Sequence, residues 1–317
     1  MSNTTGLETI TSGTGELEPV SDTTSYGAET GSDSPVVLLT GAGSGIGAAT
    51  ALAFAEKGWT VYATDVETPL SEEIQTRCRT RELDVTDGEQ SRGVVADVLA
   101  ETGRLDVLVN NAGYAVPGAI EEVPVDETKA EFDVLVHGPH RLIREVLPAM
   151  REQGSGTIVN VSSVLGLAAY QGLGSYAAGK AAMEALSDSL RLELRGTGID
   201  VVLVEPPWVE TPFADDARAE LAGRERHESY AETYAALEDG WALDGGPLAL
   251  SPERVADTIV AAATDRSPWA RYPVGIVATF IRWTRWFPPA LLDPIRRAFG
   301  WATTRIGRLG ARLRQWR

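Results

Sequence analysis

Short apolar runs alternate with helical patterns along the middle of the chain. The run 36–39, Val-Val-Leu-Leu, is typical of a strand buried on both faces of a parallel sheet. A helical pattern at 48–57 and a second strand pattern at 59–64 follow it. Further strands are expected at 105–109, 156–162 and 200–204, and long helices at 126–152 and 174–195. This order predicts an α/β protein with a doubly wound (Rossmann) parallel sheet and helices on both faces.

Three segments depart from this alternation. Residues 1–34 are acidic, contain no Lys or Arg and show no apolar period, which predicts a disordered, solvated tail. Residues 212–250 are polar and helix-prone and follow a strand end. They are expected to form a lid over a ligand site at about 212–250, the alternative being a plain surface excursion. We therefore expect one catalytic domain over 35–280, with an Arg- and Trp-rich extension at 281–317.

The amino-acid composition argues against several classes of function. The 317 residues include one cysteine, Cys78, and three histidines without the spacing of a zinc motif, so neither a disulfide framework nor a metal centre is expected. A formal net charge of -17 argues against a nucleic-acid partner. The many carboxylates and only three lysines suit a protein adapted to concentrated salt, and an ordinary acidic protein is the alternative.

The first residues lack a basic segment followed by an apolar run, and no stretch reaches about 18 consecutive apolar residues. The expected location is therefore the cytoplasm.

A glycine-rich turn connects the first predicted strand to the first helix. Gly41, Gly45 and Gly47 allow the backbone to turn tightly and to approach a pyrophosphate at the amino end of the helix. Asp65 ends the second strand, where a carboxylate accepts hydrogen bonds from ribose hydroxyls and repels a 2′-phosphate. Val66 follows it, where a phosphorylated cofactor needs an arginine. We therefore predict NAD as the cofactor, in preference to NADP. The alternative is an ordinary acid at a strand end.

Three motifs, found at 40–47 (TGAGSGIG), 110–113 (NNAG) and 176–180 (YAAGK), resemble those of the classical short-chain dehydrogenase/reductase family in order and spacing. The likeness covers 35 to about 215 closely and continues loosely to about 280. Around residues 111–114 the chain looks most like the branch that handles steroids, retinoids and other lipophilic molecules, the 17-beta-hydroxysteroid-dehydrogenase-like enzymes. The resemblance implies an NAD-dependent oxidoreductase that transfers hydride between NAD(H) and a secondary alcohol or ketone of a lipophilic small molecule. It also implies a homo-oligomer.

The resemblance also implies catalytic roles. Tyr176 is the expected acid/base, and Lys180, four residues later on one helix face, is expected to lower the pKa of its phenol together with the nicotinamide charge. Ser163 is expected to hold the substrate oxygen. Ser162 competes for that role, because adjacent residues on a strand face opposite ways and only one can face the site.

The implied cofactor contacts extend over several loops. Asp84 matches a position that contacts adenine, although it could also simply cap the helix that starts near Asp87. After the strand at 200–204, the segment that closes over the nicotinamide has Pro207 in place of the usual glycine. The complete set is Thr40, Gly41, Gly43, Ser44, Gly45, Ile46, Gly47, Asp65, Asp84, Val85, Asn111, Ala112, Gly113, Tyr176, Lys180, Pro206, Val209 and Thr211.

Leu135 departs from the family pattern. It stands where the family has an asparagine that bends the helix and holds a water linking the lysine to solvent. Leucine does not bind that water, and His137 faces elsewhere on the helix. Two interpretations follow: an active enzyme with slower proton exchange, or a nucleotide-binding scaffold or sensor with little turnover.

The extension at 281–317 holds nine arginines and one aspartate, and the sequence Phe-Pro-Pro at 287–289 breaks it. Residues 295–317 can form a basic helix with apolar side chains at Ile295, Phe299, Ile306, Leu309 and Leu313, and tryptophans stand at 283, 286, 301 and 316. Such a segment suits peripheral contact with an anionic membrane. The alternative is docking on the protein's own acidic body.

Overall fold

The computed structural model describes residues 34–239 and 241–314, so the predicted tail at 1–34 lies outside the described residues except for Ser34. Seven parallel strands form one sheet in the order β3-β2-β1-β4-β5-β6-β7, which confirms the predicted fold class. The strands are β1 Val36–Thr40, β2 Thr60–Asp65, β3 Arg79–Glu82, β4 Val107–Asn110, β5 Gly156–Val161, β6 Ile199–Glu205 and β7 Arg271–Pro273.

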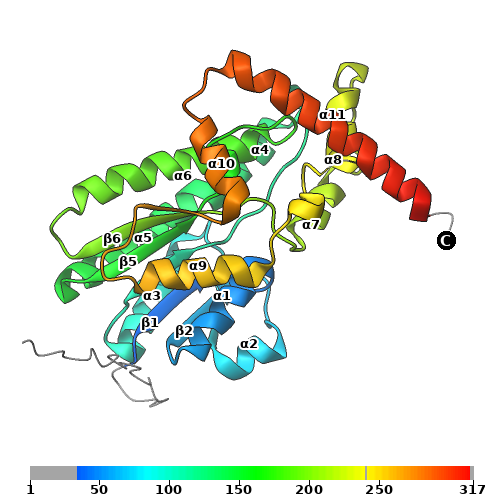
Figure 1. The fold of residues 1–317 in the computed structure, drawn as a ribbon. Helices are drawn as coiled ribbons and strands as arrows, with labels where there is room; N and C mark the ends of the chain where they lie inside the picture. Colours follow the sequence, from blue (N-terminus) through cyan, green and yellow to red (C-terminus); the bar gives the residue numbers. More distant parts are fainter. Residues whose placement is uncertain (1–33, 240, 315–317) are drawn as a thin grey trace, which may run out of the picture.

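Helices cover both faces of this sheet (Figure 1). They are α1 Gly45–Glu56, α2 Glu72–Arg77, α3 Gly88–Thr102, α4 Val125–Phe132, α5 Gly138–Gln153, α6 Gly174–Glu193, α7 Phe213–Glu220, α8 Ala231–Glu238, α9 Pro252–Thr264, α10 Gly275–Thr284 and α11 Pro289–Arg314.

Side-chain alternation along β1 explains the two layers. Val37 and Leu39 enter the core that packs under α1 and α9. Val36 and Leu38 enter the core under α3, α5 and α6. All five residues of β1 are buried, because neighbouring strands flank it and helices cover both of its faces.

The strand order reverses between β1 and β4, which both run to the same edge of the sheet. Leu39 of β1 pairs with Val109 of β4, so the turns that follow Thr40 and Asn110 emerge side by side. In doubly wound sheets, ligands bind in the crevice at this point. The fold thus brings the glycine turn and the Asn-Asn-Ala-Gly segment together at one edge.

The helix expected at 126–152 is present and runs without a break from 125 to 153. It consists of α4, one π-helical turn at Asp133–His137, and α5. The prediction of a long helix is therefore confirmed. The π turn was not predicted, and Leu135 stands at its centre.

The carboxyl-terminal extension forms two helices separated at the predicted Phe-Pro-Pro break. α10 ends at Thr284, and α11 begins at Pro289. α11 lies against α8 (Figure 1), and the Phe299 ring stacks on Trp208 with 6.2 Å between ring centroids. The side chains of Leu309 and Leu313, and all of Trp316, lie outside the described part of the chain. Over the described residues, no helix combines the length and the apolar character that spanning a bilayer demands.

Candidate active site

The glycine turn between β1 and α1 has the geometry that the sequence predicts for a phosphate-binding loop. Gly41 has a φ of +69°, a region that side chains other than glycine rarely adopt. A Cβ added to Gly47 lies only 1.8 Å from the carbonyl oxygen of Gly41, so no larger residue fits. The glycines therefore keep the backbone of this turn accessible at the amino end of α1, as close approach to a pyrophosphate requires.

Asn111 and Thr40 lock this turn. The Asn111 Nδ2 donates hydrogen bonds to the carbonyl oxygens of Thr40 and Gly41, both at 3.0 Å. In return, Thr40 Oγ1 accepts from the backbone amides of Asn111 and Ala112, both at 3.1 Å. The Asn-Ala-Gly segment thus fixes the loop at the crevice.

Asp65 faces the same turn from the end of β2. Its Oδ2 accepts a hydrogen bond from the Gly43 amide at 2.7 Å, and its Oδ1 accepts from the Glu67 amide at 3.2 Å. Val66 beside it is 60% exposed. The carboxylate is therefore held at the rim of the crevice with no neighbouring cation in the loop.

Asp84 does not cap a helix, and that alternative is wrong. Asp87 is the N-cap of α3 and accepts hydrogen bonds from the next turn's amides. The Asp84 carboxylate instead accepts from the amide and hydroxyl of Thr86, at 2.8 and 2.7 Å. Asp84 and Val85 both border the crevice.

Tyr176 and Lys180 lie on one face of α6, at the wall of the crevice. Lys180 is buried, donates from Nζ to the Val161 carbonyl oxygen at 2.7 Å, and lies 5.7 Å from the centre of the Tyr176 ring. Ser163, just beyond β5, hydrogen-bonds to Tyr176, and its Oγ also accepts from the Leu165 amide at 3.1 Å. The three side chains thus converge next to the glycine turn.

Burial governs the electrostatics of this pair. It raises the pKa of the Tyr176 phenol, as does the charge of Glu131, whereas the Ser163 hydrogen bond lowers this pKa. Burial also lowers the pKa of Lys180 to about 8. The sequence expectation was a phenol pKa depressed by Lys180 and the nicotinamide. The protein alone acts in the opposite direction and favours the neutral phenol.

Both candidate serines border the crevice, so strand alternation does not separate them as expected. They differ in their partners. Ser163 bonds to Tyr176, whereas the buried Ser162 hydroxyl has no hydrogen-bond partner among the described residues and lies beside Gly166.

Glu131 is a buried carboxyl group of this site that the sequence did not reveal. It is 0% exposed, and its Oε1 accepts a hydrogen bond from the Val116 amide at 2.9 Å, while Oε2 has no partner in the described residues. Burial raises its pKa, and a hydrogen bond with Ser175 and the charge of Lys180 lower it. One signal was available: Glu131 stands four residues before Leu135, which places both on one helix face.

Leu135 packs against α6. A Cβ on Gly113 lies 2.8 Å from one Leu135 methyl group, and a Cβ on Gly179 lies 2.9 Å from the other. The leucine is thus packed between the Asn-Ala-Gly segment and α6. Its position leaves an apolar contact where the resemblance places a water.

The crevice has a volume of about 830 Å³ and is partly covered by the segment after β6. The Phe213 ring at the start of α7 lies 5.5 Å from the Tyr176 ring, and Thr211 touches the space above Gly45. Predicted residues on its lining are Gly41, Ser44, Gly45, Ile46, Asp65, Asp84, Val85, Asn111, Ala112, Gly113, Ser163, Tyr176, Lys180, Pro206, Val209 and Thr211. The other three, Thr40, Gly43 and Gly47, shape the turn from behind.

These residues fit a dinucleotide. The glycine cradle leaves no room for a Cβ, and an acid stands at the ribose position of the Rossmann arrangement. Across the described ranges, no cluster of three or more His, Cys, Asp or Glu side chains could hold a metal ion.

Fold and site together define a dinucleotide-binding α/β protein of the oxidoreductase type. The family model for short chain dehydrogenases matches residues 35–222, and the chain belongs to this family. It is 31% identical over 247 residues to a probable short-chain type dehydrogenase/reductase of Helicobacter pylori, covering 76% of this chain and 88% of that protein. It is 35% identical over 246 residues to the 3-oxoacyl-(acyl-carrier-protein) reductase of Thermotoga maritima, covering 74% and 92%.

Another relative is the 3-ketodihydrosphingosine reductase of Bacteroides thetaiotaomicron, 36% identical over 200 residues that cover 63% of this chain and 72% of that protein. Among solved structures, a short-chain dehydrogenase from Streptomyces avermitilis superposes with a TM-score of 0.69 at 36% identity, covering 83% and 94% of the two chains. A Burkholderia phymatum family member in complex with NAD gives a TM-score of 0.66 at 28% identity, covering 79% and 92%. The chain is therefore an oxidoreductase that uses a nicotinamide cofactor.

Proposed function

We propose that the protein is an NAD(H)-dependent reductase of a lipophilic ketone, which it converts to a secondary alcohol, and that the reverse oxidation occurs at the same site. The observation that carries this proposal is the convergence of Ser163, Tyr176 and Lys180 on one wall of the crevice, beside the glycine turn. Two relatives are named as reductases of 3-keto or 3-oxo compounds, which supports reduction of a ketone as the direction of the reaction.

Ser163, Tyr176 and Lys180 have different roles in the proposed proton transfer. Ser163 is positioned to donate a hydrogen bond to the substrate oxygen and to hold it against Tyr176. The Tyr176 hydroxyl donates its proton to that oxygen as negative charge develops, and burial keeps the phenol neutral beforehand. Lys180 stays anchored on the Val161 carbonyl and stabilises the phenolate that results. The bound nicotinamide supplies the hydride.

Asp65 supports NAD as the preferred cofactor. Its carboxylate is fixed at the end of β2 by two backbone amides, and Val66 offers no positive charge for a 2′-phosphate. A phosphorylated ribose at this position meets an uncompensated negative charge. We therefore propose NADH as the physiological reductant.

The apolar lining supports a lipophilic substrate, as in the steroid- and retinoid-handling branch. Toward the segment after β6, the crevice lining includes Tyr114, Asp216 and Glu220 together with a larger group of apolar side chains. The apolar group is Ala115, Val164, Leu165, Leu173, Phe213, Ala217, Ala242 and Leu243. One relative is named for reduction of a long-chain sphingoid ketone. We accordingly propose that residues 212–250 act as a lid that closes over such a substrate.

Turnover of Tyr176→Phe tests the function. The variant is to be compared with Tyr114→Phe, which removes a hydroxyl from the same crevice, by following NADH absorbance at 340 nm with a panel of apolar ketones. We expect kcat to fall by about 10²–10⁴-fold in Tyr176→Phe only. Equal turnover of a confirmed substrate by Tyr176→Phe and wild type would overturn the proposal.

A nucleotide-binding scaffold or sensor is the second candidate, and Leu135 is the observation that favours it. Tight NADH binding in calorimetry without turnover on any ketone of the panel identifies this alternative. Residues 35–280 as catalytic domain, a homo-oligomer, cytoplasmic location and adaptation to salt stay predictions from the sequence.

A further inference from the structure

The outward face of α10 is apolar. Ile276, Phe280 and Trp283 are 86%, 69% and 69% exposed, and their spacing of four and three residues places them in one stripe along the helix. The buried Ala278 marks the opposite side of this helix. A continuous exposed apolar stripe of this kind marks an interaction site.

Further exposed apolar side chains follow α10 in the chain. Nine of the fifteen exposed large hydrophobic side chains in the described residues fall between 276 and 306, so they are concentrated in the two terminal helices and the segment between them. Leu291 and Ile295 are four residues apart on α11, and Ile306 lies eleven residues further on, which places all three on one side of that helix. We give the name α10–α11 face to all nine exposed apolar side chains of this segment, of which Trp301 lies on another side of α11 than Ile295: Ile276, Phe280, Trp283, Trp286, Phe287, Leu291, Ile295, Trp301 and Ile306.

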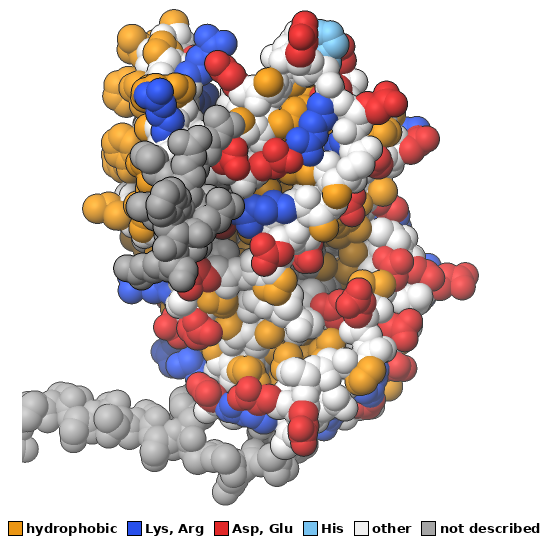
Figure 2. Space-filling model, turned by 90° about the vertical axis from the view of Figure 1, so that its right-hand side faces the viewer, with side chains coloured by type: hydrophobic (Ala, Val, Ile, Leu, Met, Phe, Trp, Pro, Cys, Tyr) orange, Lys and Arg blue, Asp and Glu red, His pale blue; other side chains and the backbone are white. Residues whose placement is uncertain are grey.

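Arginines are interleaved with these side chains. Arg285 and Arg297 are exposed, and the Arg305 guanidinium lies 4.5 Å from the centre of the Trp301 ring. The whole extension 281–317 has nine arginines and one aspartate, in a chain whose net charge is -17. Figure 2 shows hydrophobic and basic side chains along the edge where α11 lies, and acidic side chains scattered over the opposite side.

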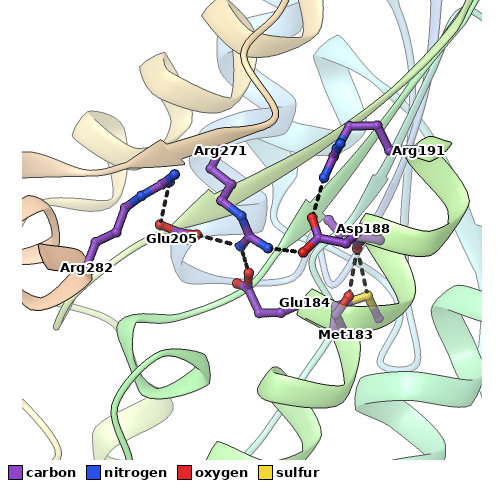
Figure 3. Close-up of polar contacts among 9 residues, drawn as sticks. Met183, Glu184, Asp188, Arg191, Glu205, Arg271 and Arg282 are labelled. Carbon is purple, nitrogen blue, oxygen red and sulfur yellow. Dashed lines mark hydrogen bonds and ion pairs between the residues drawn. The ribbon is translucent and has the colours of Figure 1, made fainter. Parts of the chain in front are cut away.

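Both helices are anchored on the catalytic body. Arg282 on the inner side of α10 pairs with the buried Glu205 at 3.6 Å (Figure 3). On α11, the Phe299 ring stacks on Trp208, which itself borders the crevice. The sequence analysis gave docking on the protein's own body as the alternative for this extension. Phe299 does pack on the body in this way, whereas Ile295 and Ile306 are exposed. These two contacts hold α10 and α11 against the body that contains the crevice.

We propose that the α10–α11 face docks on the anionic phospholipid surface of a membrane, and that the proposed lipophilic substrate enters the crevice from that membrane. Tryptophan and arginine side chains suit the headgroup region, where apolar rings insert and guanidinium groups meet phosphates. The acidic remainder of the chain is repelled by the same surface, which fixes the orientation. A symmetric contact between two copies instead sets the arginines of one copy against those of the other.

Vesicle co-sedimentation tests this docking without substrate. The full chain is mixed with vesicles of phosphatidylglycerol and phosphatidylcholine, or of phosphatidylcholine alone, at low and high salt. We expect binding to the anionic vesicles only, weakened by salt. Ile276→Ser/Phe280→Ser/Trp283→Ser should weaken that binding by at least about tenfold, because apolar insertion is lost. Leu192→Ser, which removes a 69% exposed leucine from α6, is the control and should bind as wild type.

Three results overturn the docking: no binding to anionic vesicles, equal binding to neutral ones, or unchanged binding of the triple variant. A fourth result also overturns the docking: wild type is an oligomer that does not bind vesicles, and the triple variant is a monomer. In that case the α10–α11 face forms contacts between copies of the chain. Turnover of a water-soluble ketone by the triple variant should match wild type. Since docking is measured without turnover, failure of the docking and failure of the proposed function remain distinguishable.

Discussion

Replacing Arg271 tests the buried ion network that joins β7 to the sheet and α6. The Arg271 guanidinium pairs with Glu205 at 2.9 Å, with Asp188 at 2.6 Å and with Glu184, as Figure 3 shows. The Glu205 side chain is 0% exposed and that of Glu184 is 7% exposed, so removal of the cation leaves two buried carboxyl groups with insufficient positive charge. For Arg271→Met we expect a loss of about 3–5 kcal/mol in the free energy of unfolding.

The loss should grow with pH. Burial raises the pKa of Glu205, while neighbouring arginines lower it, and burial lowers the pKa of Arg271 to about 10. A carboxyl group with a raised folded pKa gives stability that is present below its unfolded pKa and is lost as pH rises through the folded pKa. In Arg271→Met the closest remaining cation is the half-exposed Arg282, so the pKa of Glu205 rises further. The variant should therefore be more destabilised at pH 8 than at pH 5.

Thermal and urea unfolding at both pH values measure this effect. About 3–5 kcal/mol corresponds to a Tm decrease of roughly 5–8 °C for a chain of 317 residues, because the unfolding entropy grows with chain length. Arg191→Met is the matched control, because Arg191 pairs with Asp188 at the surface and such pairs contribute at most about 1 kcal/mol. Adding Glu205→Gln to Arg271→Met should restore part of the loss. A loss below about 1 kcal/mol, or a loss that is independent of pH, would show that the buried carboxyl groups do not depend on Arg271.

Three further predictions concern the site. We expect wild type to favour NADH over NADPH by about 10–100-fold in kcat/KM, and Asp65→Ser/Val66→Arg should reverse this preference. An unchanged NADH/NADPH ratio of kcat/KM in the variant would contradict the role of Asp65. Glu131→Gln should move the pH profile of alcohol oxidation to lower pH, because the carboxylate raises the pKa of Tyr176; identical profiles would exclude this coupling. Leu135→Asn should raise turnover if the missing amide limits proton exchange, and unchanged turnover shows that it does not.

The central strands were predictable because each is a contiguous apolar run buried on both faces. The edge strands were not. β3 consists of Arg-Thr-Arg-Glu and β7 of Arg-Tyr-Pro, and neither is fully buried, so no apolar run marks them. They become strands because a neighbouring strand, β2 or β6, offers free backbone groups at the sheet edge. Such tertiary pairing has no local signature.

The motif part of the site was predictable for a similar reason. Thr40 and Asn111 are 71 residues apart, yet Thr40 ends one buried strand and Asn111 directly follows another, and the topology brings those strand ends together. Glu131 and Arg271 lie on elements without such a landmark. Glu131 belongs to a polar helix, which by itself indicates a solvent-facing surface, and its burial follows only from how α4 packs on α6.

The segment around Leu135 combines a π turn with a buried apolar contact. Leu135 lies at the centre of the turn Asp133–His137 and packs against Gly113 and Gly179. The carboxyl group whose charge acts on both Tyr176 and Lys180 lies one helical turn earlier, at Glu131. The charge of Glu131 therefore acts on Tyr176 and Lys180 although the chain has no asparagine at position 135. An inactive scaffold would then have to result from restricted access of water to Lys180.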